Sequence, residues 1–501
     1  MPAASERPLA HSTPKQSSVS VPELTSRGRV LLLTLVTLAG AWLRLFHLGT
    51  KSLWLDEGAT VTLARMAWPQ FVHVWWYGEA SFQGAFFLLM RVWLHLGPGE
   101  FWVRLPAAIF GIASIPLIYL LARKLVGVVP ALAAAAIFAF SPTHVYYSQE
   151  ARSYTMTILL VLVSSWFFVR AVEQNRETDW ALWTLFSVMA VYSHTFASLV
   201  MVAQACSLFF HKKPTPWGRL IVHALVILAM CAPGLTYVLR VPPEAVAFHG
   251  MPEPTPKQLL HLALFLGGSG EKFILSAVLW IAAVVAIRRA GKDNAAPGSF
   301  WRGMLIISWA SIPILLTGLA SLFHPVFVQR YMIFSLPAAV MLASRGMVAL
   351  PKRRLGLWLV IALCVASVPN IFIRYRKPRE DWRNATNVIL ASAQPGDAVV
   401  IYPFYAIVGF DYYRQLDPHT PALRVFTQPY YGVGDNDETL LRALSSDSRG
   451  FRHVWVMVRR EGPGRDNLQD DSPAVAAKLQ SVFGTPAVAQ FTDITVLEFG
   501  R

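Results

Sequence analysis

Cysteines, charged residues and nucleotide-binding motifs are all scarce in this sequence. Only three of its 501 residues are cysteines. All three fall in apolar runs without paired or metal-ligand spacing, so we expect no disulfide and no zinc motif. Charged residues make up 15% of the chain. We find no Gly-rich phosphate loop and no internal repeat, so nothing in the sequence supports a nucleotide site.

Hydrophobic residues are abundant instead. They make up 54% of the chain, and the mean hydropathy of +0.44 is above that of ordinary soluble domains. Apolar runs near the roughly 20 residues needed to cross a bilayer recur through the first three quarters of the chain. They lie at about 29–48, 103–122, 128–146, 154–170, 218–239, 272–288, 301–322, 327–346 and 355–373. A longer run, Trp180 to Phe210, is interrupted at 192–194. We split it into two short spans that meet at His194, which gives about eleven spans.

The net charge of +15 is best explained by membrane topology. Lys and Arg concentrate in the turns that are cytoplasmic if the N-terminus is inside. These residues are Arg123, Lys124, Arg170, Arg176, Lys212, Lys213, Arg219, Arg288, Arg289, Lys292, Arg345, Lys352, Arg353 and Arg354. The sequence therefore predicts a multi-pass membrane protein with a cytoplasmic N-terminus and no nucleic-acid partner.

The two ends of the chain differ from the membrane part. Residues 1–26 are rich in Ser, Pro and Thr and predict a disordered cytoplasmic tail, followed by a retained signal anchor. After the membrane domain at 27–373, residues 374–501 have mixed composition and predict a small α/β domain. Its expected elements are a helix at 382–391 and strands at 398–402, 454–458 and 495–499. With a cytoplasmic N-terminus, an odd number of spans places this domain on the outer side of the membrane.

Two long loops are predicted on the outer side. The first contains amphipathic pieces at 59–71 and 82–96, rich in Trp and Phe. We interpret them as juxtamembrane helices, although the second could be a tilted or re-entrant span. The other loop, at about 240–270, opens with a Pro-rich string that argues against regular structure there. It is a candidate lid over a site.

Asp56 and Glu57 directly follow the first span. Asp56 could simply cap a helix that begins near Gly58, with Glu57 favouring its positive end. A carboxylate here could also remove the proton of an acceptor hydroxyl, as a transferase requires. Neighbouring helical residues point roughly 100° apart, so the two acids need not face one pocket. Glu79, the other acid of this loop, could be a metal ligand, an acceptor-binding group or a solvated charge.

Further candidates lie where other spans reach the same side. They are Gln149, Glu150, Arg152, Tyr154, His194, Arg330 and Tyr331. Each of them also has a simpler explanation: interfacial anchoring for residues 149–154, helix capping for His194 and snorkelling for Arg330. Alternatively, the Arg side chains form a clamp for phosphate, because a guanidinium presents a fixed fork of donors. His249 and His261 in the second outer loop are weaker candidate ligands.

The strings around these residues resemble the GT-C fold glycosyltransferases of the protein O-mannosyltransferase and aminoarabinose transferase superfamily, especially bacterial mannosyltransferase-like members. The similar strings are Ser-Leu-Trp-Leu-Asp-Glu at 52–57, Gly-Glu-Ala-Ser at 78–81, Phe-Trp-Val-Arg-Leu-Pro-Ala-Ala-Ile-Phe-Gly at 101–111, Tyr-Tyr-Ser-Gln-Glu-Ala-Arg-Ser-Tyr at 146–154, Tyr-Ser-His at 192–194, Gln-Arg-Tyr at 329–331 and Arg-Glu-Asp-Trp-Arg at 379–383. The sequence departs from many relatives at 82–86, where they carry His-Pro-Pro or an apolar aromatic-rich string.

The resemblance implies an inverting sugar transfer on the outer face of a bacterial inner membrane. The donor would be a polyprenyl-phosphate sugar, and the acceptor a lipid, a glycan or a protein. Asp56 would be the general base, with Glu57 beside it and Glu79 as the second acid of the catalytic loop. Arg152 and Arg330 would contact the carrier phosphate. Some relatives bind a divalent metal cation, which makes Glu79 with His249 or His194 candidate metal ligands.

The main alternative is a polytopic transporter or flippase for a polar lipid or polysaccharide. Such proteins usually bind their substrate at mid-membrane between repeated halves. The sequence has neither a repeat nor an acidic residue in the middle of a span, so it favours the transferase.

Overall fold

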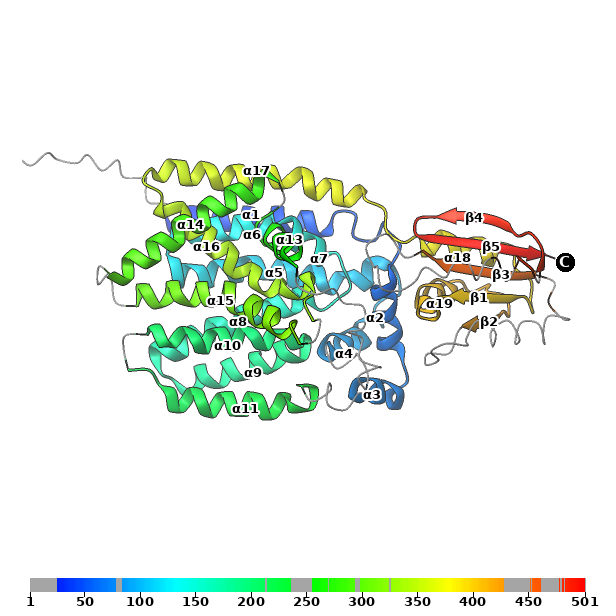
Figure 1. Cartoon of the computed structure of the whole chain (residues 1–501), viewed down its shortest axis with the longest axis horizontal. Helices are drawn as coiled ribbons and strands as arrows, with labels where there is room; N and C mark the ends of the chain where they lie inside the picture. The colour runs from blue at the N-terminus through cyan, green and yellow to red at the C-terminus, as the bar shows by residue number, and fades with distance from the viewer. Residues whose placement is uncertain are drawn as a thin grey trace, which may run out of the picture.

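The structure is a computed structural model. It describes residues 25–427 and 451–500, apart from 78–82, 212–213, 236–254, 269, 293–297, 324–325, 452, 461–476, 478–479 and 482. The predicted tail therefore lies almost entirely outside the described residues. A long helical bundle leads into short helices at one end, and a small α/β domain lies beyond them (Figure 1).

The bundle contains the predicted apolar runs as helices. Its elements are α1 (Ser26–Leu45), α5 (Glu100–Val126), α6 (Val128–Ala139), α7 (Pro142–Ser148), α8 (Tyr154–Gln174), α9 (Glu177–Ser193), η2 (Thr195–Ala197), α10 (Ser198–Ser207), η3 (Leu208–Phe210), α11 (Trp217–Leu235), α13 (Pro256–Gly267), α14 (Glu271–Lys292), α15 (Ser299–Ala320), η5 (Gln329–Ser335), α16 (Leu336–Ala349) and α17 (Arg353–Arg376).

Fewer helices than predicted qualify as full spans. Within the described ranges, eight are long and apolar enough, or nine if α6 and α7, bent by 57°, form one span. The two helical segments that meet at His194 fall short. α9 has 17 residues and begins with Glu177 and Asp179, and the segment Thr195–Phe210 is among the shorter apolar helices. Length and composition alone therefore do not support eleven full spans. The predicted break is confirmed, because extended backbone at His194 ends α9.

The spans differ in how far they are buried within the protein. The η5–α16 span is 83% buried and α8 is 72% buried, whereas α1 and α11 are only 17% and 11% buried. α8 and α16 are therefore central, and the apolar surfaces of α1 and α11 are left to face lipid. A tight reversal at Gly127, with φ of 96°, joins α5 to α6. Only glycine adopts that conformation without strain.

Three short helices, not two, follow the first span. They are α2 (Leu55–Arg65), α3 (Trp68–Tyr77) and α4 (Gly84–Trp93). The predicted piece at 59–71 is broken after Arg65, and Pro69 takes a place in the first turn of α3, where proline is tolerated. α4 has 10 residues, too few to span a bilayer, so a full span is wrong for this segment. α2 begins at Leu55, which puts Asp56 in its first turn instead of at the cap.

The second long loop is more regular than predicted. Thr255 and Gln258 form a reciprocal capping box that starts α13, so the latter half of the loop is helical. The Pro-rich half lies mostly outside the described residues.

The C-terminal domain is a five-stranded mixed sheet with two helices. Its elements are α18 (Trp382–Ser392), β1 (Ala398–Tyr402), η6 (Phe404–Ala406), α19 (Ile407–Leu416), β2 (Arg424–Thr427), β3 (His453–Arg459), β4 (Ala487–Phe491) and β5 (Ile494–Gly500). The strand order is β2-β1-β3-β5-β4. β1 runs parallel to β2 and β3, with Ala398 opposite Val454, and β5 is antiparallel to β3 and β4. The predicted helix and three strands are confirmed, whereas α19, β2 and β4 were not predicted.

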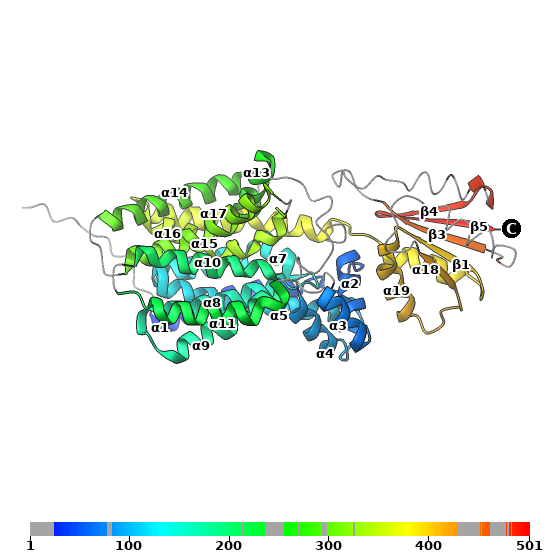
Figure 2. The same cartoon turned by 60° about the horizontal axis from the view of Figure 1, so that its bottom comes forward.

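This domain docks on the loop between α1 and α5 (Figure 2). α19 packs against α2. The hydroxyl of Tyr413 accepts hydrogen bonds from the Leu53 backbone N–H at 2.7 Å and from Ser52 Oγ at 3.1 Å, and donates to Glu100 at 3.1 Å. The loop and the domain therefore lie at the same end of the bundle, as expected if both are on one side of the membrane.

Replacing Tyr413 with Phe should weaken this docking. The change leaves the buried Leu53 N–H without its acceptor, so we expect the free energy of unfolding to fall by about 1–3 kcal/mol. The thermal unfolding midpoint of the detergent-solubilised protein measures the loss. The control is Tyr192→Phe. It removes a single hydrogen bond, to the Met230 carbonyl, that is exposed to solvent, so it should lower the midpoint less. Equal midpoints for the two variants would contradict the importance of Tyr413.

Candidate active site

A buried ion pair lies where the bundle meets the short helices. Arg104 of α5 and Glu57 of α2 are 2% and 0% exposed. Arg104 Nε and Nη2 donate to the two carboxylate oxygens of Glu57 at 2.8 and 2.7 Å. The remaining Arg104 donors reach the backbone carbonyls of Leu48, Lys51 and Ser52 at 2.9–3.1 Å. All five donors of this guanidinium are therefore used, and it fixes the chain between α1 and α2.

Glu57 is shared by further donors. Its carboxylate accepts from the Ala151 N–H at 3.0 Å and from Arg379 Nη1 at 3.3 Å. Burial alone would raise the pKa of Glu57, but Arg104 and then Arg379 outweigh it and lower the pKa below its usual value. Glu57 is thus an ionised structural hub whose oxygens face the protein.

Asp56 points in another direction, as the helical spacing predicts. Its Oδ2 lies 3.3 Å from Arg330 Nη1 at the start of η5. Its backbone carbonyl accepts from Arg152 Nη1 at 3.4 Å. The Asp56 side chain is 21% exposed, so solvent or a substrate reaches this carboxylate, in contrast to Glu57.

Several buried polar atoms around Asp56 have no hydrogen-bond partner among the residues that the structure describes. They are Asp56 Oδ2, both carboxylate oxygens of Glu150, Arg152 Nε, the Tyr154 hydroxyl, His194 Nε2 and Arg330 Nε. Buried polar groups in native proteins are nearly always hydrogen-bonded. This concentration therefore indicates a place that binds a polar molecule. His194 Nδ1 accepts the Phe196 N–H at 3.3 Å, which assigns the proton of the neutral ring to Nε2 and makes that atom a donor.

Glu150 is buried beside like charges. Burial raises its pKa to about 7, Arg379 opposes the shift, and Glu57 and Asp56 add to it. Arg379 Nη2 lies 3.8 Å from the carboxylate. Near neutral pH Glu150 is therefore partly protonated, and a neutral carboxyl can donate a hydrogen bond as well as accept one.

Two of the predicted substrate-binding residues have local roles. Gln149 Nε2 donates to the carbonyls of Leu43, Arg44 and Phe46 at 2.7–3.4 Å, so it caps the end of α1. The Tyr331 ring packs on His194, with ring centroids 4.9 Å apart. The structure brings Asp56, Glu57, Glu150, Arg152, Tyr154, His194, Arg330 and Tyr331 into one region.

Glu79 and His249, the predicted metal ligands, lie outside the described residues. Among the residues that are described, no group of three His, Cys, Asp or Glu side chains is placed to hold a metal ion.

Sequence reasoning missed the partners of the acids. Arg104 and Arg379 were noted only as parts of strings. The sequence did contain a signal for Arg104. This residue lies near the start of an apolar run, where a charged side chain requires a partner. Arg379 is 322 residues from Glu57 along the chain, and no local pattern indicates that separation.

A large cavity with a mixed polar and apolar lining adjoins this region. It has a volume of about 1240 Å³, including the solvent at its open mouth, between α6, α7, α13, α16 and α17. Gln329, which precedes Arg330, lines it and donates to the His261 carbonyl at 2.8 Å. His261, a weaker candidate ligand, thus contributes to the cavity wall.

Comparisons with known proteins bear on the fold. Residues 84–237 match the family model described as dolichyl-phosphate-mannose-protein mannosyltransferase. ArnT from Cupriavidus metallidurans in the apo state superposes with a TM-score of 0.62 at 14% identity, over 94% of this chain and 98% of ArnT. ArnT bound to undecaprenyl phosphate gives 0.60 at 13% identity, over 95% and 98%. The Archaeoglobus fulgidus oligosaccharyltransferase complex with Zn and sulfate gives 0.53 at 14% identity, over 85% and 67%. No match is found among curated protein sequences.

Removing the charge of Glu57 should strongly destabilise the fold. In Glu57→Gln, the buried guanidinium of Arg104 loses its counter-charge, which typically costs about 3–5 kcal/mol. Thermal unfolding in detergent measures it. Asp411→Asn breaks a more exposed pair with Arg414 and should cost roughly 0.5 kcal/mol. Similar losses in the two variants would refute the hub role.

Stability should also depend on pH through Glu150. Its pKa lies above the ordinary 4.5, at about 7. The folded state thus binds more protons between these values, and stability falls as pH rises through that window. We expect the unfolding midpoint of the wild type to drop more from pH 5 to pH 8 than that of Glu150→Gln. Parallel pH profiles would show that Glu150 does not titrate in this window.

Proposed function

We propose that this chain, which has the fold of the GT-C membrane glycosyltransferases, transfers a sugar from a polyprenyl-phosphate carrier to an acceptor hydroxyl with inversion. The observation that carries the proposal is the partly exposed Asp56–Arg330 pair, 3.3 Å apart, among buried polar atoms without partners. A base and a phosphate-binding cation are thus side by side at the ends of the spans.

Asp56 is the general base in this proposal. Its carboxylate takes the proton of the acceptor hydroxyl while the hydroxyl oxygen attacks the anomeric carbon. The bond from that carbon to the phosphate oxygen breaks, and the lipid phosphate leaves with the electron pair. Attack opposite the leaving group inverts the anomeric configuration. Glu57, although predicted as catalytic with Asp56, is assigned a positioning role, because its oxygens already accept from Arg104, Arg379 and Ala151.

The phosphate contacts are assigned to Arg330 and Arg152. Negative charge grows on the leaving phosphate, and donors that are already oriented stabilise it. Each of the two side chains has a buried Nε that finds no hydrogen-bond partner in the described part of the chain. The pKa of Arg152 is raised, because Asp56 overcomes the opposing effect of burial, so its guanidinium stays charged. His194 Nε2 and the Tyr154 hydroxyl are further donors on the same side.

The large cavity between α6, α13, α16 and α17 is assigned to the isoprenoid chain of the carrier, which would contact the apolar part of its lining. Leu264, Leu336 and Val340 are among its apolar lining residues, and Gln329 lies at its edge. This arrangement lets an apolar chain end in a phosphate near Arg330. ArnT was crystallised with undecaprenyl phosphate, which supports a carrier of this class.

The membrane orientation follows from the basic turns. With the N-terminus in the cytoplasm, Asp56 and the α/β domain face the outer side of what we propose to be a bacterial inner membrane. The acceptor would be a lipid, glycan or protein exposed there. A transporter would need a polar site near mid-membrane, whereas the polar cluster lies at the helix ends, where α8 and η5 begin and α9 stops.

Asp56→Asn should abolish transfer without preventing membrane insertion. Loss of a general base reduces the rate by roughly 100-fold to 10,000-fold. The measurement compares, by mass spectrometry, envelope lipids, glycans and proteins from cells that lack the protein or express wild type or variant. A product one sugar heavier should appear with wild type and nearly vanish with Asp56→Asn.

Asp411→Asn, in α19 of the C-terminal domain, is the matched control and should make as much product as wild type. Full activity of Asp56→Asn would reject Asp56 as the base. Movement of a polar lipid across the membrane without any new glycosidic bond would instead support the transporter.

A further inference from the structure

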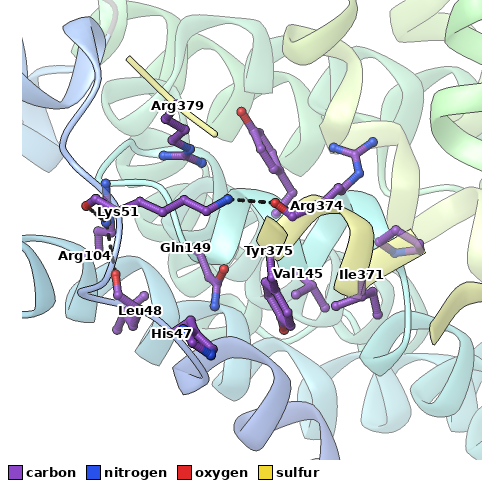
Figure 3. A pocket seen from close by; sticks show the side chains of 12 residues that line it. His47, Leu48, Lys51, Arg104, Val145, Gln149, Ile371, Arg374, Tyr375 and Arg379 are labelled. Carbon is purple, nitrogen blue, oxygen red and sulfur yellow. Dashed lines mark hydrogen bonds between the residues drawn. The ribbon is translucent and has the colours of Figure 1, made fainter. Parts of the chain in front are cut away.

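A second cavity adjoins the Glu57–Arg104 pair, because Arg104 is one of its lining residues. Its volume is about 390 Å³ when the solvent at its open mouth is included. It is bounded by the segment after α1, by α7 and its following turn, and by the end of α17 with the linker beyond it (Figure 3). Because α1 and α17 both end here, the cavity sits where the membrane meets water.

The lining is cationic. Lys51, Arg104, Arg374 and Arg379 line the cavity, and no Asp or Glu is among its lining residues in the described part of the chain. Arg104 has no donor left, and Arg379 is shared by Glu57 and Glu150. Lys51 and Arg374 therefore add positive charge that no carboxylate offsets there. Burial, together with Arg379 and Arg104, lowers the pKa of Lys51 to about 8, which reflects this positive surrounding.

Donors remain for a ligand. Lys51 Nζ donates to the carbonyls of Arg374 and Lys377 at 2.7 Å each, and an ammonium group has a third N–H. The Arg374 guanidinium makes no hydrogen bond or ion pair with the described residues. It stacks over the Tyr146 ring at 5.1 Å, and Arg379 stacks over the same ring at 5.1 Å. The tyrosine thus holds two guanidinium groups close together despite their repulsion.

The surface beside the cavity is apolar. Trp42 and Leu45 at the end of α1, and Ile373 at the end of α17, are 52%, 40% and 62% exposed. The rings of Trp42 and Phe372 bring the two helix ends into contact, with centroids 6.2 Å apart. Acyl chains would cover this surface in a bilayer, and a lipid headgroup would then lie at the depth of the cationic cavity.

From this combination we propose that the cavity binds the phosphate group of an anionic membrane lipid. Its Arg and Lys donors suit phosphate oxygens, and the exposed ends of α1 and α17 would hold the acyl chains. The lipid would connect α1, α7 and the linker to the C-terminal domain. Arg374 also lines the larger cavity assigned to the isoprenoid chain, so the two cavities adjoin. Arg152 and Arg330, which are assigned to the carrier phosphate, do not line the smaller cavity, and the lipid site does not depend on the proposed reaction.

Native mass spectrometry of the full-length protein in detergent tests the proposal. The probes are dioctanoyl phosphatidylglycerol, the zwitterionic dioctanoyl phosphatidylcholine, and inorganic phosphate. We expect one phosphatidylglycerol to bind more tightly than either of the others. Arg374→Gln should weaken its binding by about fivefold, the effect of one basic side chain near a membrane surface, while Arg374→Lys retains most of it.

Two controls separate the cavity from general charge effects. Arg376→Gln removes a nearby exposed charge that does not line the cavity, and Arg330→Gln changes only the site assigned to transfer. Both should keep phosphatidylglycerol binding. Equal losses in Arg374→Gln and Arg376→Gln, or a loss in Arg330→Gln as large as that in Arg374→Gln, would overturn the proposal. Tighter binding of inorganic phosphate than of the lipid would reject the lipid as the source of the phosphate.

Discussion

The buried pairing of Arg104 with Glu57 is the constraint on which the rest of the site depends. A guanidinium at the end of a membrane helix cannot remain unpaired without a large free-energy cost. It is satisfied by one carboxylate and three backbone carbonyls. The same carboxylate reaches the Ala151 N–H and Arg379. One ion pair therefore connects α5, the loop after α1, the turn before α8 and the linker after α17.

Because of this ion pair, the two adjacent acids, Glu57 and Asp56, have different surroundings. Since Glu57 is held inward, helical geometry turns Asp56 toward Arg330 and solvent. The position of a functional side chain is better defined when packing and hydrogen bonds fix the residues next to it. The charged groups assigned to the proposed transfer come from separate elements, which are α2, the turn before α8 and η5.

The membrane sets the depth at which this polar chemistry is possible. The polar atoms that have no partner among the described residues and the cationic cavity lie at helix ends, where water and headgroups reduce the cost of charge. Deeper in the bundle, polar side chains bond locally, as when the Ser164 and Ser187 hydroxyls pair at 2.8 Å. Aromatic faces help to keep the cations in place, as Tyr146 does for Arg374 and Arg379.

Hydropathy alone determined the helical runs, the break at His194 and the strands β1, β3 and β5, because each is a local pattern of apolar residues. Together with the basic turns, it predicted that Asp56, Glu150, Arg152 and Arg330 share one side of the membrane. It did not reveal β4, whose residues are largely exposed, or α19, whose buried face is set by contact with α2. Only the tertiary structure decided that Glu57 is a hub while Asp56 is accessible, because the deciding partners, Arg104, Arg379 and Arg330, come from distant parts of the chain.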